Sequence, residues 1–173
     1  MSIAEHLLKF DLPMLIARLT AEDIPLILET SIECRLCLWS ADAYRSELTR
    51  GDSIMLKAET FSGDFAGFAV GRTFDMGAKG RSVELTNIGV RQAFRGQRFG
   101  SLLLKSFLSK CRDSEAANVI LEVRETNQIA RRFYEHFGFS VTGRRKSFYL
   151  DPTEDALTMK LELAPAKAVG IHT

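Results

Sequence analysis

The chain has 173 residues and a net charge of +1, which fits one globular domain and excludes a protein that binds nucleic acid through its bulk charge. No apolar run is long enough for a membrane span, and the N-terminus lacks the basic start and apolar run of a secretory signal. The cysteines offer one Cys34–Cys37 pair without a second pair, so we expect no zinc or redox site, no metal and a reducing, cytoplasmic setting.

The first third of the chain reads as a lead-in, a strand and two helices. Residues 1–12 form a short amphipathic lead-in, with a helix expected over residues 4–10. A first strand follows at residues 14–19. Thr20 then offers a hydroxyl cap, with the acid Asp23 three residues later, so a helix is expected to begin here and to break at Trp39. Ser40 can cap a second helix over residues 41–48.

The remainder alternates strands with two further helices. A hairpin turn at residues 62–64 joins two strands, and a strand at residues 81–90 runs into a basic loop that contains two glycines. Gly138 is a natural residue for the end of the last helix. The expected later helices are residues 99–111 and 127–137. The expected later strands are residues 53–59, 65–74, 81–90, 118–123, 139–142, 147–150 and 156–163.

This order predicts an α/β fold with a mixed, mostly antiparallel central sheet and helices on both faces. We expect a single domain over residues 13–163 and a mobile tail at residues 164–173. The loop after Val90 should lie at the carboxyl end of its strand, where open α/β sheets bind ligands.

The basic loop Arg95-Gly-Gln-Arg-Phe-Gly100 connects a strand to the start of a helix, where backbone N–H groups and the helix dipole attract phosphate. It lacks the third glycine of a dinucleotide fingerprint and the Gly-Lys-Ser/Thr of a P-loop. Local positive charge at Arg91, Arg95 and Arg98, and again at residues 144–146, suits a small anionic ligand or a solvated turn. The loop alone does not choose among phosphate ligands.

Four segments together resemble the GNAT superfamily of acyl-CoA-dependent N-acetyltransferases. They are Asn87-Ile-Gly-Val90, the basic loop, Leu121-Glu-Val-Arg-Glu-Thr-Asn127 and Phe133-Tyr-Glu-His-Phe-Gly-Phe139. Leu38-Trp-Ser40, and Arg144-Arg-Lys-Ser-Phe-Tyr149 followed by Glu154-Asp-Ala156, are most similar to the RimI type, the ribosomal-protein-alanine N-acetyltransferases. The resemblance covers roughly residues 14–163.

The resemblance implies acetyl-CoA as co-substrate and assigns roles to individual residues. Glu122 would be the general base, acting through water, and Tyr134 the general acid beside the coenzyme sulfur. The main chain at Ile88 and Val90 would pair with the pantetheine arm, and Asn127 would hold the coenzyme near that end. The residues expected to bind the coenzyme are Ile88, Gly89, Val90, Arg95, Gly96, Gln97, Arg98, Phe99, Gly100, Ser101 and Asn127.

These roles agree with the chemistry of acetyl transfer. The reaction needs a neutral amine, an aligned thioester and a partner for the departing thiolate. A peptide α-amino group has a pKa of about 7.7–8, so a carboxylate suffices as base, whereas a lysine amine near about 10.4 needs more help. Proton transfer from a tyrosine near about 10 to a thiol near about 8.5 is uphill by roughly 2 kcal/mol. Tyr134 is therefore expected to stabilise the sulfur by hydrogen bonding. Taken singly, Glu122 also fits a solvent-facing strand residue and Tyr134 a packing residue.

Three positions depart from the family pattern. Arg98 stands where the loop carries glycine, and it could obstruct the phosphates or contact them. Phe148 replaces a tyrosine and Leu38 a proline, which bears on peptide specificity more than on acetyl transfer.

The expected acceptor is a protein N-terminus, such as that of a ribosomal protein. We expect the protein to act as a monomer or homodimer and to bind neither nucleic acid nor a membrane. Two alternatives stay open. One is acetylation of a small amine or antibiotic, which an enclosed acidic pocket would favour. The other is a non-catalytic domain that senses acyl-CoA, which Arg98 leaves open although Glu122 and Tyr134 argue against it.

Overall fold

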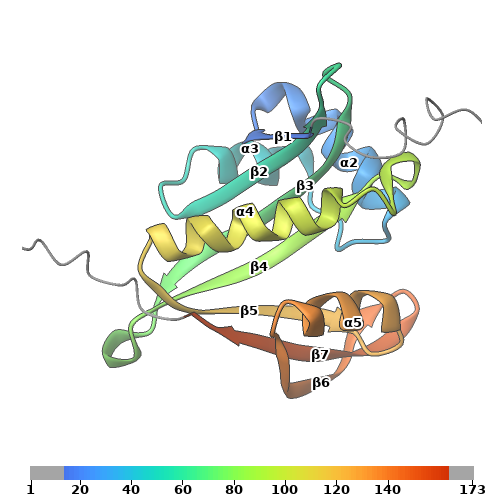
Figure 1. Ribbon diagram of the computed structural model, residues 1–173. Helices are drawn as coiled ribbons and strands as arrows, with labels where there is room; N and C mark the ends of the chain where they lie inside the picture. Colours follow the sequence, from blue (N-terminus) through green and yellow to red (C-terminus); the bar gives the residue numbers. More distant parts are fainter. Residues whose placement is uncertain (1–13, 164–173) are drawn as a thin grey trace, which may run out of the picture. The chain divides into compact units, whose positions relative to one another are not determined.

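The computed structural model describes residues 14–163 (Figure 1). The lead-in expected at residues 1–12, with its helix, and the tail expected at residues 164–173 lie outside the described residues. The described chain divides into two compact units: residues 14–70 with Asn87–Phe107, and Gly71–Thr86 with residues 108–163. The expectation of a single domain over residues 13–163 stays a prediction.

Seven strands pair in the order β1-β2-β3-β4-β5-β7-β6. β4 and β5 are parallel and are connected by the helix α4, while the pairs β1/β2, β5/β7 and β6/β7 are antiparallel. The mixed, mostly antiparallel sheet is thus confirmed. The strands are β1 (Met14–Arg18), β2 (Ser53–Thr60), β3 (Phe65–Asp75), β4 (Arg81–Val90), β5 (Ala116–Arg124), β6 (Ser140–Leu150) and β7 (Thr153–Glu162).

The first unit contains β1, β2, the adjoining ends of β3 and β4, the 3-10 turns η1 (Ala21–Asp23) and η3 (Gln92–Phe94), and the helices α2 (Ile24–Glu33) and α3 (Ala41–Leu48). α4 (Phe99–Asp113) begins here. All six residues 65–70 of β3 are buried, and since alternate strand residues point to opposite faces, this part of the sheet is covered on both faces. On one side Tyr44 of α3 packs edge-on against Phe68.

Local signals set the starts of the 3-10 turn η1 and of the helix α3. The N–H and hydroxyl of Thr20 donate to the Asp23 carboxylate at 2.8 and 3.0 Å, and the Ser40 hydroxyl accepts from the N–H of Ala43 at 3.1 Å. α3 therefore covers the predicted residues 41–48.

α2 is shorter than predicted, because it ends at Glu33 instead of reaching Trp39. Arg35 takes a left-handed conformation with φ of 52°. The N–H groups of Arg35 and Leu36 bond to the carbonyls of Ile32 and Ser31, and this pair of bonds closes a helix end. A left-handed residue here is usually glycine, so the sequence carries no obvious signal for this stop.

The second unit contains the far ends of β3 and β4, the 3-10 turn η2 (Gly77–Lys79), the end of α4, and β5, α5 (Gln128–His136), β6 and β7. The predicted strand pieces 139–142 and 147–150 are one strand, β6, whose pairing with β7 shifts register twice. The basic residues at 144–146, assigned to no strand in the sequence analysis, belong to it. Between residues 14 and 163 the helices are too short or too polar to cross a membrane.

Candidate active site

The segment expected to bind the coenzyme lies in the first unit, at the end of β4. Gly89 is buried, and a Cβ there would come within 3.1 Å of Leu36 and 3.2 Å of the Cys34 sulfur. A Cβ at Gly67 on β3 would lie 2.3 Å from the Gly89 carbonyl oxygen, so both glycines permit a close approach of backbone and neighbours.

The Val90 carbonyl accepts from Arg95 Nε at 3.0 Å and from the Cys34 thiol at 3.4 Å. A pantetheine arm that used this carbonyl would therefore displace one of these donors. Ile88 and Val90 are half-buried, which leaves one side of the strand end open to contact.

Carboxylates of α2 hold the segment that follows β4. Glu33 accepts from the N–H of Gln92 and lies 3.8 Å from Arg95, and Glu29 lies 3.7 Å from Arg91. A recess of about 800 Å³ borders this segment and is also lined by α2 and the turn between β2 and β3. Arg91 and Arg95 thus have acidic neighbours, and a phosphate ligand would compete with Glu33 for Arg95.

The loop itself uses two left-handed residues to enter α4. Gly96 has φ of 73° and Arg98 has φ of 68°. The Arg98 carbonyl accepts the helical hydrogen bond from Leu102 at 3.0 Å, so Arg98 is the residue from which the helix starts. Helix starts leave N–H groups without an intrahelical partner, here on residues that include Gly100 and Ser101. This combination suits an anion such as a pyrophosphate.

Not every predicted loop residue can use its side chain on a ligand. Phe99 is buried and packs edge-on against Phe94 with ring centroids 5.6 Å apart, so only its main chain is available. The Gln97 amide donates to the Ala93 carbonyl at 2.9 Å, which braces the loop. Arg98 is exposed.

The candidate catalytic residues and Asn127 lie in the second unit. Glu122 is on β5, with its side chain 17% exposed, and its Oε1 accepts from Arg145 Nη1 of β6 at 2.6 Å. The neighbours Leu121 and Val123 are buried on the opposite face of the strand. Glu122 therefore lies on a polar face of the sheet, with a cation already on its carboxylate.

Tyr134 is on α5 and is 8% exposed, packed beside Phe133 and Phe139 at ring distances of 5.5 and 5.7 Å. Burial raises the pKa of Tyr134 far above its ordinary value, and the Tyr149 phenol raises it further. Complete proton transfer to a thiolate is then harder than in water, which favours Tyr134 as a neutral hydrogen-bond donor.

Asn127 is the N-cap of α5. Its Oδ1 accepts from the N–H of Ala130 at 3.1 Å, so only its Nδ2 group could donate to a coenzyme. Its N–H bonds to the Arg124 carbonyl, which ties the start of α5 to the end of β5.

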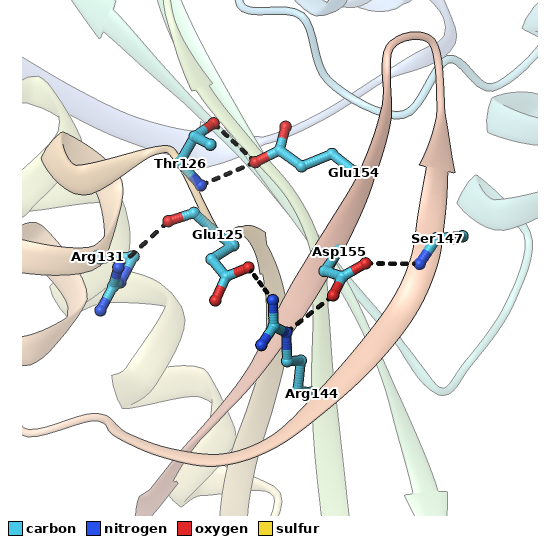
Figure 2. A network of polar contacts seen from close by, with 7 residues as sticks. All are labelled: Glu125, Thr126, Arg131, Arg144, Ser147, Glu154 and Asp155. Atoms are coloured by element: carbon cyan, nitrogen blue, oxygen red, sulfur yellow. Dashed lines mark hydrogen bonds and ion pairs between the residues drawn. The ribbon is translucent and has the colours of Figure 1, made fainter.

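Ion pairs without a signal in the sequence connect the β6–β7 hairpin to the end of β5 (Figure 2). Arg144 bonds to Glu125 at 2.6 Å and to Asp155 at 2.8 Å, and Asp155 also accepts from the N–H of Ser147. That N–H and Arg144 lower the pKa of Asp155. Arg144 and Arg145 thus bind carboxylates of the chain itself, which disfavours reading this basic cluster as an anion site. Only the strand register brings these charges together, so spacing along the sequence does not reveal them.

A second set of contacts ties the end of β5 to β7. Glu154 accepts from the hydroxyl and N–H of Thr126 at 2.7 and 2.8 Å and pairs with Arg124 at 3.2 Å. The Thr126 bonds and Arg124 lower the pKa of Glu154. Among residues 14–163 no group of three or more His, Cys, Asp or Glu side chains could hold a metal.

Comparison with known proteins places the chain in a family. The model of the acetyltransferase (GNAT) family matches residues 25–139. A candidate ribosomal protein bS18-alanine N-acetyltransferase of Bacillus subtilis is 30% identical over 139 residues, which are 80% of this chain and 88% of that protein.

The ribosomal protein bS18-alanine N-acetyltransferase of Escherichia coli K12 is 27% identical over 151 residues, 86% of this chain and 97% of that protein. The crystal structure of the ribosomal-protein-S18-alanine N-acetyltransferase from Escherichia coli is similar with a TM-score of 0.75 and 25% identity. That match covers 92% of this chain and 99% of the other.

Proposed function

The chain belongs to the acetyltransferase (GNAT) family and takes its acetyl group from acetyl-CoA, and we propose that its acceptor is the α-amino group of a protein N-terminus. This acceptor is supported by the match to enzymes named for the alanine of ribosomal protein bS18. The match extends over 97% of the Escherichia coli protein. A ribosomal protein that begins with alanine is therefore the first acceptor to test.

Most of the residues assigned to the coenzyme lie in the first unit. The N–H groups at the start of α4, from Phe99 to Ser101, and the left-handed turn at Gly96 would receive its pyrophosphate. The main chain at Ile88 and Val90 would pair with the pantetheine arm, and the Nδ2 group of Asn127 would support it. When bound, acetyl-CoA supplies an acetyl group already activated as a thioester.

The chemistry is assigned to Glu122 and Tyr134. The neutral amine of the acceptor attacks the acetyl carbonyl, the C–S bond breaks, and the amine loses one proton, through water, to the Glu122 carboxylate. Tyr134 donates a hydrogen bond to the departing sulfur. Its burial keeps the phenol protonated, so it can act as donor at any physiological pH.

The test is turnover of acetyl-CoA with three panels of acceptors: peptides with a free N-terminus, peptides whose only amine is a lysine side chain, and small amines including aminoglycosides. We expect turnover with the first panel, strongest for an N-terminal alanine. Turnover confined to small amines would replace the proposed acceptor, and coenzyme binding without turnover would support a sensor.

A further inference from the structure

The side chain of Arg145 reaches Glu122 across an intervening strand. Glu122 on β5 pairs with Thr158 on β7, and Thr158 pairs with Gly143 on β6. Arg145, two residues further along β6, lies on the same face and pairs with Ala156. Gly143 has no side chain and Ala156 only a methyl group, so this face leaves a path from Arg145 to the Glu122 carboxylate at 2.6 Å.

Two further contacts keep the guanidinium in place. Its carbon lies 4.3 Å from the centroid of the Phe148 ring, a cation–π contact. Asp155 accepts a hydrogen bond from the N–H of Ser147, which anchors to β7 the irregular stretch of β6 that follows Arg145. The Arg145 side chain is 58% exposed, so the pair contributes little to folding stability by itself. We therefore look for a role of Arg145 in the reaction and not in folding stability.

That role follows from the chemistry of the acceptor. A carboxylate close to an amine favours the ammonium form, which cannot attack a carbonyl, because an opposite charge stabilises the charged state. A guanidinium bonded to the carboxylate offsets this effect. We propose that Arg145 is a positioning residue for acetyl transfer. It holds the Glu122 carboxylate in one direction and balances its charge, so that the bound acceptor amine stays neutral.

The other cations on this face of the second unit are paired with other carboxylates. Arg124 pairs with Glu154, and Lys160 pairs with Glu162. Glu84 lies on β4 opposite Ile120, two residues before Glu122. Among residues 14–163 it is Arg145 whose cation contacts the Glu122 carboxylate. The proposal rests on the proposed function, in which Glu122 faces the acceptor.

The experiment compares the pH dependence of kcat for the wild type, Arg145→Gln and Arg145→Lys, with acetyl-CoA and an alanine-initiated peptide. Arg145→Gln should move the midpoint of the acidic limb upward by about one pH unit, a loss of about tenfold near neutral pH that disappears in alkali. Arg145→Lys keeps the charge and should restore most of the wild-type profile. Arg144→Gln is the matched control: the neighbouring arginine is 54% exposed and binds Glu125 and Asp155, so its loss should leave the midpoint in place.

A second acceptor separates the charge effect from structural damage. A peptide that begins with trifluoroalanine has an amine that is already neutral near pH 7, because the fluorines withdraw electrons. On this peptide Arg145→Gln should match the wild type. An equal loss on both peptides, or no change of the midpoint with the alanine peptide, would overturn the role of Arg145.

Failure of the proposed function gives a different result. If the wild type acetylates no peptide N-terminus, the acceptor assignment fails, and the Arg145 series is then run on whichever amine is acetylated. If Glu122→Gln leaves kcat unchanged, the base assignment fails. If Glu122→Gln is impaired while Arg145→Gln keeps the wild-type midpoint, only the inference about Arg145 is lost.

Discussion

Arg98 has a left-handed backbone conformation, which favours glycine over a residue with a side chain. It has φ of 68°, a conformation that costs a residue with a Cβ about 1–2 kcal/mol, and the resemblance to the family predicts glycine at this position. The loop therefore makes a left-handed turn at Arg98 without a glycine there.

Arg98→Gly is therefore expected to raise the free energy of unfolding by about 1 kcal/mol, after the entropy that glycine adds to the unfolded chain is subtracted. Urea denaturation measures this. Arg98→Ala is the control, since it removes the side chain but keeps the Cβ and the strain. Equal gains in both variants would show that the side chain, and not the backbone, is the source.

Cys111 is a buried thiol on α4, and burial raises its pKa to about 12. The unfolded thiol ionises near its ordinary value, so the folded state binds the extra proton and its stability falls as pH rises between about 9 and 12. From about pH 8 to about pH 10.5, Cys111→Ala should lose about 2 kcal/mol less unfolding free energy than the wild type. Urea denaturation at both values measures the difference, and identical losses in the two proteins would contradict the buried-thiol explanation.

At the scale of elements, α3 shows how a local signal fixes a helix. Ser40 accepts from the N–H of Ala43, and the helix starts at the next residue, Ala41, as its sequence predicts. Ser40→Ala should lower the free energy of unfolding by about 1 kcal/mol, measured by thermal or urea denaturation. Ser46→Ala, an exposed change inside the same helix, should be neutral or slightly stabilising. A loss as large in the second variant would mean that the cap is not responsible.

Elements with such signals were predictable, and elements set by long-range pairing were not. The strand at residues 81–90 and the helix at residues 41–48 have their predicted bounds. The stop of α2 at Arg35 was missed because a left-handed arginine gives no glycine signal. The Glu122–Arg145 pair was missed because it depends on the register of β6 against β7, which two irregularities alter. The candidate coenzyme and catalytic residues came from the resemblance to a family, since periodicity alone assigned them ordinary structural roles.

At the scale of the whole molecule, the candidates divide between the two units. Residues 88–101 belong to the unit that holds the loop and the start of α4, and Glu122, Asn127 and Tyr134 belong to the unit that holds β5 and α5. Apart from Asn127, the residues expected to bind the coenzyme lie in the first unit, and the candidates for proton handling lie in the second. Coenzyme affinity and kcat should therefore respond to different substitutions.

Glu122→Gln is expected to lower kcat by about 100-fold while the KM for acetyl-CoA stays within about twofold. Initial rates at varied acetyl-CoA measure both, and a KM change as large as the kcat change would contradict this division.

The central claim is acetyl transfer to an N-terminal amine, and one paired measurement tests it. The enzyme is incubated with acetyl-CoA and, in separate reactions, with two versions of an alanine-initiated peptide. The masses of the products are measured by mass spectrometry. One version has a free N-terminus and blocked lysines; the other has a blocked N-terminus and free lysines. The account predicts one added acetyl group on the first version and none on the second. Acetylation of the second version alone would contradict it.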